Sequence, residues 1–122
     1  MKIVYIAHPV GSPSVFENLE KIKEIVHALN LARRDIVPFV PYMTDCMVLD
    51  DTDPKQRNRG MGNNRAILES GMVNEIWLYG DRISEGMLTE ITICQRLKIH
   101  IIAMTAKTRL ALQEINKQKS KP

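Results

Sequence analysis

Four short runs of apolar and β-branched residues alternate along the chain with segments whose apolar residues recur at helical spacing. The runs cover residues 3–7, 36–40, 75–79 and 99–103. Continuous apolar runs of this length are typical of strands that are buried on both faces of a sheet. Strands that alternate with helices pair in parallel through right-handed crossovers. The alternation therefore predicts an α/β fold built on a parallel sheet.

Helical segments are predicted at residues 14–34, at about 55–72 and 86–97, and as a short fraying helix near 110–115. Ser14 suits the N-cap of the first helix, because Glu17 completes a capping box. Pro38 lacks a backbone donor, so its strand is expected at a sheet edge. Four or five strands in 122 residues fit a flavodoxin-like three-layer sandwich with strand order 2-1-3-4(-5). Residues 41–60 are expected to form a long polar loop, a candidate lid.

Length and charge limit the classes of function. A chain of 122 residues corresponds to one domain, expected over residues 1–106, with a basic helix or tail at 107–122. This tail holds five of the 17 basic and one of the 14 acidic residues, a balance of +4, which leaves −1 for the rest. Because the basicity is confined to the tail and aromatic residues are only 5%, nucleic acid is not an expected partner.

Other sequence signals concern location and cofactors. No apolar run approaches the roughly 20 residues of a membrane span, and residues 1–6 lack a signal-peptide pattern. A cytoplasmic protein is therefore expected, in the host cytoplasm if the chain is phage-encoded. Cys46 and Cys94 fit neither a disulfide framework nor a zinc site. Because the glycine-rich dinucleotide and P-loop motifs are also missing, no cofactor or metal is expected.

A ligand crevice is expected where the strand order reverses, between the loops at residues 8–14 and 80–86. In the second loop Ser84 and Gly86 open a helix whose free amides and dipole favour an anion. Glu90 follows one turn later, and a carboxylate beside an anion site can attack an electron-poor carbon such as an anomeric carbon. The alternative is that Ser84 only caps the helix and that Glu90 is a solvated helix residue. Because Glu90 is expected in the second turn of a surface helix, its replacement by Gln is expected to change activity or ligand binding far more than stability.

Two residues of the first strand and its exit have two interpretations each. The Tyr5 hydroxyl either reaches a carboxylate over the sheet edge or belongs to a half-buried core tyrosine. His8 either contacts a ligand at the strand exit or is an ordinary loop residue. His27 and His100 are expected on a helix surface and within or beside the core, respectively.

Three motifs in order resemble those of the nucleoside 2-deoxyribosyltransferase superfamily. The sequence Tyr-Ile-Ala-His-Pro at residues 5–9 is similar to the family's first strand, and Asn-Glu-Ile-Trp-Leu-Tyr-Gly at residues 74–80 to its third. The sequence Ser-Glu-Gly-Met-Leu-Thr-Glu at residues 84–90 resembles its nucleophile-bearing helix, in the form found in small phage and bacterial members. The resemblance extends over residues 3–103 and implies the same flavodoxin-like fold.

The resemblance implies cleavage of an N-glycosidic bond, followed by transfer of the glycosyl group to another base or to water. Glu90 would be the nucleophile, Tyr5 would orient it, and Glu75 would stand where a base-contacting aspartate is common. Ser84 resembles the serine of members that act on nucleoside 5′-monophosphates. The substrate-binding residues expected at the crevice are His8, Pro9, Gly11, Gly80, Asp81, Ser84, Gly86 and Met87. The family also implies a homodimer or higher homo-oligomer.

Two classes of function remain open on the sequence. The first is an N-glycosidase or deoxyribosyltransferase that acts on a nucleotide or nucleoside through Glu90. The second is a non-catalytic binder or sponge of a nucleotide-derived signal that uses the same crevice. The glutamate at position 75 and the long segment at residues 41–60 keep the second class open, because neither matches the transferase pattern.

Overall fold

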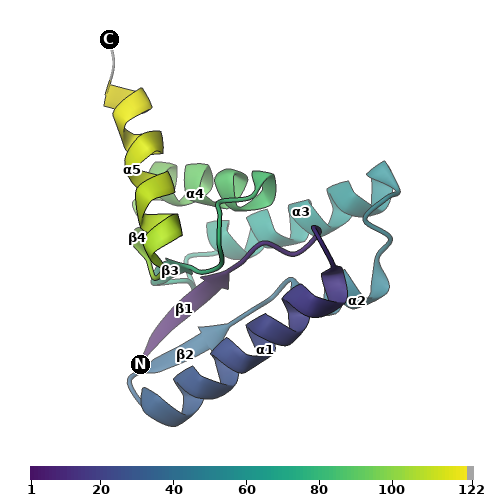
Figure 1. Ribbon diagram of the computed structural model, residues 1–122, viewed down its shortest axis with the longest axis horizontal. Coiled ribbons are helices and arrows are strands. Elements are labelled where there is room, and N and C mark those ends of the chain that lie inside the picture. The colour runs from purple at the N-terminus through teal and green to yellow at the C-terminus, as the bar shows by residue number, and fades with distance from the viewer. Residues whose placement is uncertain (121–122) are drawn as a thin grey trace.

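The computed structural model describes residues 1–120 and contains a single parallel sheet flanked by helices (Figure 1). The strands are β1 (Lys2–Ala7), β2 (Ile36–Phe39), β3 (Glu75–Leu78) and β4 (His100–Ala103). The helices are α1 (Val15–Ala32), α2 (Met43–Val48), α3 (Pro54–Glu69), α4 (Glu85–Leu97) and α5 (Ala106–Ser120). Among these helices of residues 1–120, none is long and apolar enough to cross a membrane.

The sheet has the order β2-β1-β3-β4, and all neighbouring strands are parallel. This confirms the predicted α/β, flavodoxin-like arrangement with its 2-1-3-4 order. Pro38 lies in β2 at the edge of the sheet, as its missing backbone donor predicts. The order reverses between β1 and β3, so the carboxyl ends of these two strands bound the place where ligands bind in such sheets.

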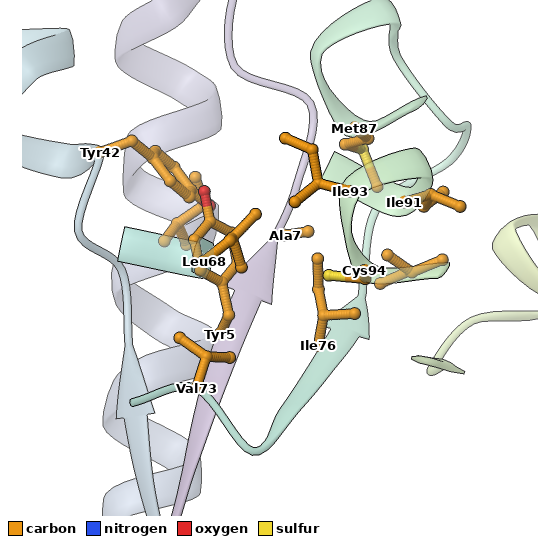
Figure 2. Close-up of a cluster of buried hydrophobic side chains, with 12 residues drawn as sticks. Tyr5, Ala7, Tyr42, Leu68, Val73, Ile76, Met87, Ile91, Ile93 and Cys94 are labelled. Carbon is orange, nitrogen blue, oxygen red and sulfur yellow. The ribbon is translucent and has the colours of Figure 1, made fainter. Parts of the chain in front are cut away.

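Alternating side chains of the central strands pack on opposite faces of the sheet. Val4, Ile6 and Trp77 point to the face that α1 covers. On the other face a larger cluster lies under α3 and α4 (Figure 2). That cluster contains Tyr5, Ala7, Ile76 and Leu78 of the strands with Leu68, Met87, Ile91 and Cys94 of the helices. Because both faces are buried, β1 and β3 read as continuous apolar runs rather than alternating ones.

The segment at residues 41–60 is largely helical, so the prediction of a long polar loop is wrong. α2 occupies residues 43–48, which was not predicted, whereas α3 begins at Pro54, in agreement with the helix predicted from about residue 55. Asp53 caps α3 by accepting a hydrogen bond from the Lys55 amide at 3.1 Å, and proline at the first helical position reinforces this start. Met43 and Cys46 of α2 pack against the core, which compensates for a helix too short to be stable alone.

The C-terminal segment is also more ordered than predicted. Instead of a short fraying helix, α5 runs from Ala106 to Ser120, and the rest of the predicted tail, residues 121–122, lies outside the described residues. Thr108 is wholly buried, and its hydroxyl donates to the Leu78 carbonyl at 3.2 Å. Leu112 and Ile115 pack against the core. These contacts attach the basic helix to the sheet.

Candidate active site

A cavity of about 470 Å³ lies beyond the carboxyl ends of β1 and β3. The loop after β1 contributes His8, Gly11 and Ser12 to its wall, and the start of α4 contributes the opposite side. α2 and α3 close a third side. The cavity therefore lies in the crevice that the strand order predicts, with one further wall formed by α2 and α3.

α4 directs its amino terminus into this cavity. Ser84 is the N-cap, and its side-chain oxygen accepts a hydrogen bond from the Met87 amide at 3.3 Å. Ser84, Glu85, Gly86 and Met87 all line the cavity. A helix amino terminus carries a partial positive charge and free amides, so this wall favours a negatively charged ligand group.

Glu90 lies one turn further along α4 and is buried at the cavity wall, with 9% of its surface exposed. The alternative of a solvated helix residue is therefore wrong. Burial raises the pKa of Glu90 to about 7, while the hydrogen bond from Tyr5 acts in the opposite direction. Near neutral pH the carboxyl group can consequently exist in either protonation state.

Tyr5 lies behind Glu90 in the core and donates its hydroxyl hydrogen to Oε2 of Glu90. The ring is completely buried, so this tyrosine belongs to the core and also reaches the carboxylate. Burial, followed by the charge of Glu90, raises the pKa of Tyr5 well above its ordinary value, so the hydroxyl remains a donor. Tyr42 packs beside it with ring centroids 5.8 Å apart (Figure 2) and donates to the Ile6 carbonyl at 2.6 Å.

His8 lines the cavity at the exit of β1. Its Nδ1 lies 2.6 Å from the Pro9 carbonyl and donates to it, because a carbonyl oxygen only accepts. Burial lowers the pKa of His8, so the ring is neutral at pH 7.

Gly80 has a φ of +94°, and a Cβ there would lie 2.5 Å from Cδ of Pro9. This close approach holds the loops after β1 and β3 together.

The structure does not bring every predicted residue to the cavity. Pro9, Gly80 and Asp81 stand behind or beside the wall rather than lining it. Asp81 forms an ion pair with Arg82, with Oδ1 of Asp81 2.9 Å from Nη1 of Arg82. Arg82 itself lines the cavity.

The expectation that Glu75 contacts the nucleobase is wrong, because Glu75 lies far from the cavity. Glu75 is the first residue of β3, at the amino end of the sheet, whereas the cavity lies at the carboxyl end. Its carboxylate pairs with Lys2 at 2.8 Å and accepts from the Trp77 indole at 2.9 Å. These partners lower the pKa of Glu75 and satisfy its oxygens.

Sequence reasoning missed the wall that α2 and α3 form. Polar side chains on this wall are Asp45, Asp51, Gln56, Arg57, Asn64 and Arg65. Arg57 spans to the start of α4, with Nη2 3.6 Å from Oε2 of Glu85. The helix predicted at about residues 55–72 already contains Arg57, and the Asp53-Pro54 start fixes its first turn. No local signal indicates that its polar side chains line a cavity.

The described geometry can be compared with known families. A family model described as a domain of unknown function (DUF7768) matches residues 2–104. The chain belongs to the DUF7768 family. The matched residues of this DUF7768 protein include all four strands and the whole cavity wall, whereas α5 lies beyond them. None of the curated proteins compared with the DUF7768 chain matches it.

Proposed function

We propose that this protein cleaves the N-glycosidic bond of a nucleotide or nucleoside, or transfers its (deoxy)ribosyl group, with Glu90 as the nucleophile. The observation that carries the proposal is that Glu90, buried at the cavity wall, accepts a hydrogen bond from Tyr5 in the core behind it. A carboxylate held by a tyrosine hydroxyl, and otherwise desolvated, is a suitable nucleophile for an anomeric carbon. The resemblance to nucleoside 2-deoxyribosyltransferases supports the same assignment.

The chemistry proceeds in two steps. A carboxylate oxygen of Glu90 forms a bond to C1′ while the C1′–N bond breaks, and the base leaves with the bonding electron pair and takes up a proton from water. Water or a second base then attacks C1′, the glycosyl–Glu90 bond breaks, and the carboxylate is regenerated. The attacking water oxygen or base nitrogen gives up its proton to the solvent in this second step. Two displacements at one carbon retain its configuration.

Tyr5 acts as a positioning residue in this scheme. Its hydrogen bond to Oε2 holds the carboxylate and leaves Oε1 available for the attack. The same bond lowers the pKa of Glu90 against the effect of burial, which increases the ionised fraction at neutral pH. The ionised carboxylate is a much stronger nucleophile than the neutral acid.

The amino terminus of α4 suits a 5′-phosphate. Ser84, the free amides that follow it and Arg57 are all at this end of the cavity. A charged phosphate would gain from the helix dipole and from charge-assisted hydrogen bonds. The sugar of a nucleotide bound there would extend along α4 toward Glu90, one turn further into the helix.

A second candidate function is a non-catalytic receptor or sponge for a nucleotide. The position of Glu75 favours it, because this residue cannot protonate a leaving base from the amino end of the strands.

In either function we expect a homo-oligomer, most simply a dimer, in the cytoplasm where nucleotides are abundant. A neighbouring subunit would shield the open side of the cavity from water.

Product analysis separates the two functions. The protein is incubated with a panel of ribo- and deoxyribonucleoside monophosphates and their nucleosides, and chromatography measures the released base. The catalytic proposal predicts release that falls at least a thousandfold in Glu90→Gln. Glu114→Gln, an exposed position on α5, serves as the matched control and keeps full release. Tight binding with complete recovery of the ligand would instead favour the receptor.

A further inference from the structure

His8 presents one unused hydrogen-bonding atom at the exit of β1. The side chain lines the cavity, and only 7% of its surface is exposed. Its Nδ1 donates to the Pro9 carbonyl at 2.6 Å, whereas Nε2 has no hydrogen-bond partner among residues 1–120. Nε2 is not sealed from solvent either, because Oδ1 of Asn64 is the one side-chain polar atom of this part of the chain that is both sealed and unpartnered. Nε2 is therefore open to a ligand.

The hydrogen bond of Nδ1 fixes the chemical role of Nε2. A neutral imidazole carries its proton on one nitrogen only, so with the proton on Nδ1 the other nitrogen is an acceptor. Burial lowers the pKa of His8, and the positive charges of Lys21 and Arg82 act in the same direction. The hydrogen bond to Pro9 and the charge of Asp81 oppose this shift without reversing it. At pH 7 Nε2 therefore offers a lone pair, and a ligand atom beside it must donate a hydrogen bond.

His8 lies on the side of the cavity that leads to α4. A Cβ added to Gly80 would lie 3.5 Å from Nε2, so the imidazole packs against the loop after β3. This loop continues into Ser84, the N-cap of α4, and α4 then carries Glu90 to the cavity wall. Much of the apolar lining of the cavity comes instead from α2, α3 and their ends, through Tyr42, Leu49, Met61 and Leu68.

Of the three parts of a nucleotide, the sugar fits this position best. Phosphate oxygens are negatively charged acceptors and would oppose the lone pair of Nε2. The flat apolar faces of a base match the lining that α2 and α3 supply, and C1′ has to lie at Glu90 for the proposed reaction. The ring hydroxyls of the sugar lie one and two bonds further from C1′, and each hydroxyl can donate a hydrogen bond.

We propose that His8 recognises the sugar of the substrate: its Nε2 accepts a hydrogen bond from a ring hydroxyl group. His8 is in this role a specificity-determining residue that takes no part in the bond cleavage itself. The substrate class is then a nucleotide whose 2′- or 3′-hydroxyl group is free, and analogues without that hydroxyl bind poorly. This inference rests on the proposed nucleotide function and specifies how the same cavity selects its ligand.

Calorimetry tests the proposal with ligands that differ only in their sugar hydroxyls. The probes are the 5′-monophosphates of adenosine, guanosine, cytidine and uridine, each with its 2′-deoxy, 3′-deoxy and 2′,3′-dideoxy forms. The nucleophile variant Glu90→Gln is the binding host, so that turnover does not interfere. The dideoxy form is expected to bind about fivefold more weakly or worse, because it leaves a buried acceptor without a partner. The single-deoxy form that shows this loss identifies the hydroxyl.

Substitutions of His8 in this host show whether the loss belongs to Nε2. His8→Phe keeps a planar ring without an acceptor, and it should bring the ratio for that hydroxyl near one. His8→Gln keeps an acceptor oxygen at the end of the side chain and should retain part of the preference. His27→Phe is the matched control, because His27 is exposed on α1 outside the cavity, and it should leave the ratio unchanged.

Nitrogen NMR of the unsubstituted His8 ring gives a readout that does not depend on the folding of a His8 variant. In the free host the proton should be on Nδ1 and absent from Nε2. The nucleotide with the identified hydroxyl should shift the Nε2 resonance, and the form without this hydroxyl should leave it nearly unchanged.

Several outcomes would overturn the inference while nucleotides still bind. These are a proton on Nε2, equal binding of all four forms of a nucleotide, and a hydroxyl preference that survives His8→Phe. An equal loss of affinity for the hydroxylated and dideoxy forms in His8→Phe would also overturn it, because His8 would then only shape the cavity. Failure of every nucleotide to bind would overturn the proposed function as well.

Discussion

The hydroxyl of Tyr5 donates a hydrogen bond to the carboxylate of Glu90, which lies 85 residues further along the chain. β1 delivers the tyrosine from the core, and α4 delivers the glutamate to the cavity wall. Tyr5 is wholly buried in the core, and Glu90 is the buried carboxyl group of α4 that lines the cavity. Their hydrogen bond therefore links the core to the cavity wall. Its ionisation is therefore coupled both to folding and to the proposed chemistry.

Glu90→Gln should remove a pH dependence of stability. The pKa of Glu90 is about 7 in the folded state and its ordinary value is 4.5, so the folded state binds more protons between these values. The contribution of Glu90 to the stability of the wild type is therefore greatest below pH 4.5. Between pH 4.5 and pH 7 this contribution to the free energy of unfolding falls by about 3 kcal/mol. Denaturant melts of both proteins between pH 5 and 8 measure this difference. Parallel curves for the two proteins would contradict the assigned pKa.

Tyr5→Phe should slow base release and move its pH dependence. Without the hydrogen bond that lowers it, the pKa of Glu90 rises further above 7. The acidic limb of the rate profile should move to higher pH, and the rate at pH 7 should fall at least tenfold with partial recovery at pH 8.5. Tyr79→Phe is the control, because Tyr79 packs against the opposite face of the sheet. A uniform loss at every pH would mean that Tyr5 does not tune Glu90.

Ser84→Ala should reduce phosphate recognition. The wild type is expected to bind a nucleoside monophosphate at least ten times more tightly than the nucleoside, because a charge-assisted hydrogen bond contributes about 1.5–3 kcal/mol. The variant should lose most of this ratio while it binds the nucleoside nearly as before.

Ser14→Ala is a matched control for Ser84→Ala. Both serines are N-caps whose side chains accept from a backbone amide at 3.3 Å, but only Ser84 lines the cavity. Each substitution should cost about 1 kcal/mol of stability. Only Ser84→Ala should change the binding ratio, and an equal ratio for nucleotide and nucleoside in the wild type would reduce Ser84 to a helix cap.

Gly80→Ala should destabilise the protein by about 2 kcal/mol or more. Gly80 has a positive φ, and the added Cβ would lie 2.5 Å from the ring of Pro9. Gly62→Ala is the opposite case, because Gly62 lies in the interior of α3 with no heavy atom within 4 Å of the added Cβ. That substitution should stabilise by about 1 kcal/mol through helix propensity. Thermal unfolding compares the two, and equal effects would contradict the packing at Gly80.

Self-association should be visible by light scattering at micromolar concentration. The expected mass is at least twice the 13.9 kDa of one chain. Phe16 is 73% exposed and follows Val15 of the cavity rim, so an apolar surface is available beside the opening. Phe16→Glu should shift the mass toward the monomer, whereas Leu31→Glu, 74% exposed at the far end of α1, should not. A wild-type mass of 13.9 kDa would contradict the proposal.

The sequence predicted the sheet well, because its signals are local. β-branched runs, the missing donor of Pro38 and the Ser14 and Ser84 caps all act through neighbouring residues, and each is present as expected. The helix at about residues 55–72 was predicted from its apolar residues and is present as α3. α2 was missed, because its six residues are too few for a helical period to be visible.

The part of the candidate site that lies at the carboxyl ends of the strands could be predicted from the sequence, whereas the part that depends on the packing of distant helices could not. Ser84 and Glu90 follow from their position after β3, but the burial of Glu90 depends on Tyr5 and on helices that pack from elsewhere in the chain. Glu75 matched a position of a family motif, yet Glu75 and its ion-pair partner Lys2 lie at the amino end of the strands, away from the cavity.

The long separation of Tyr5 and Glu90 also bears on how the protein is synthesised. During translation β1 emerges first, and α4 follows only after β2, α3 and β3 have been made. Until α4 docks on the sheet, the Glu90 carboxyl group is hydrated and titrates as an ordinary acid. A nascent or truncated chain that ends before α4 would hold the tyrosine without its carboxylate. The buried carboxyl group with its raised pKa therefore exists only after α4 has docked on the sheet.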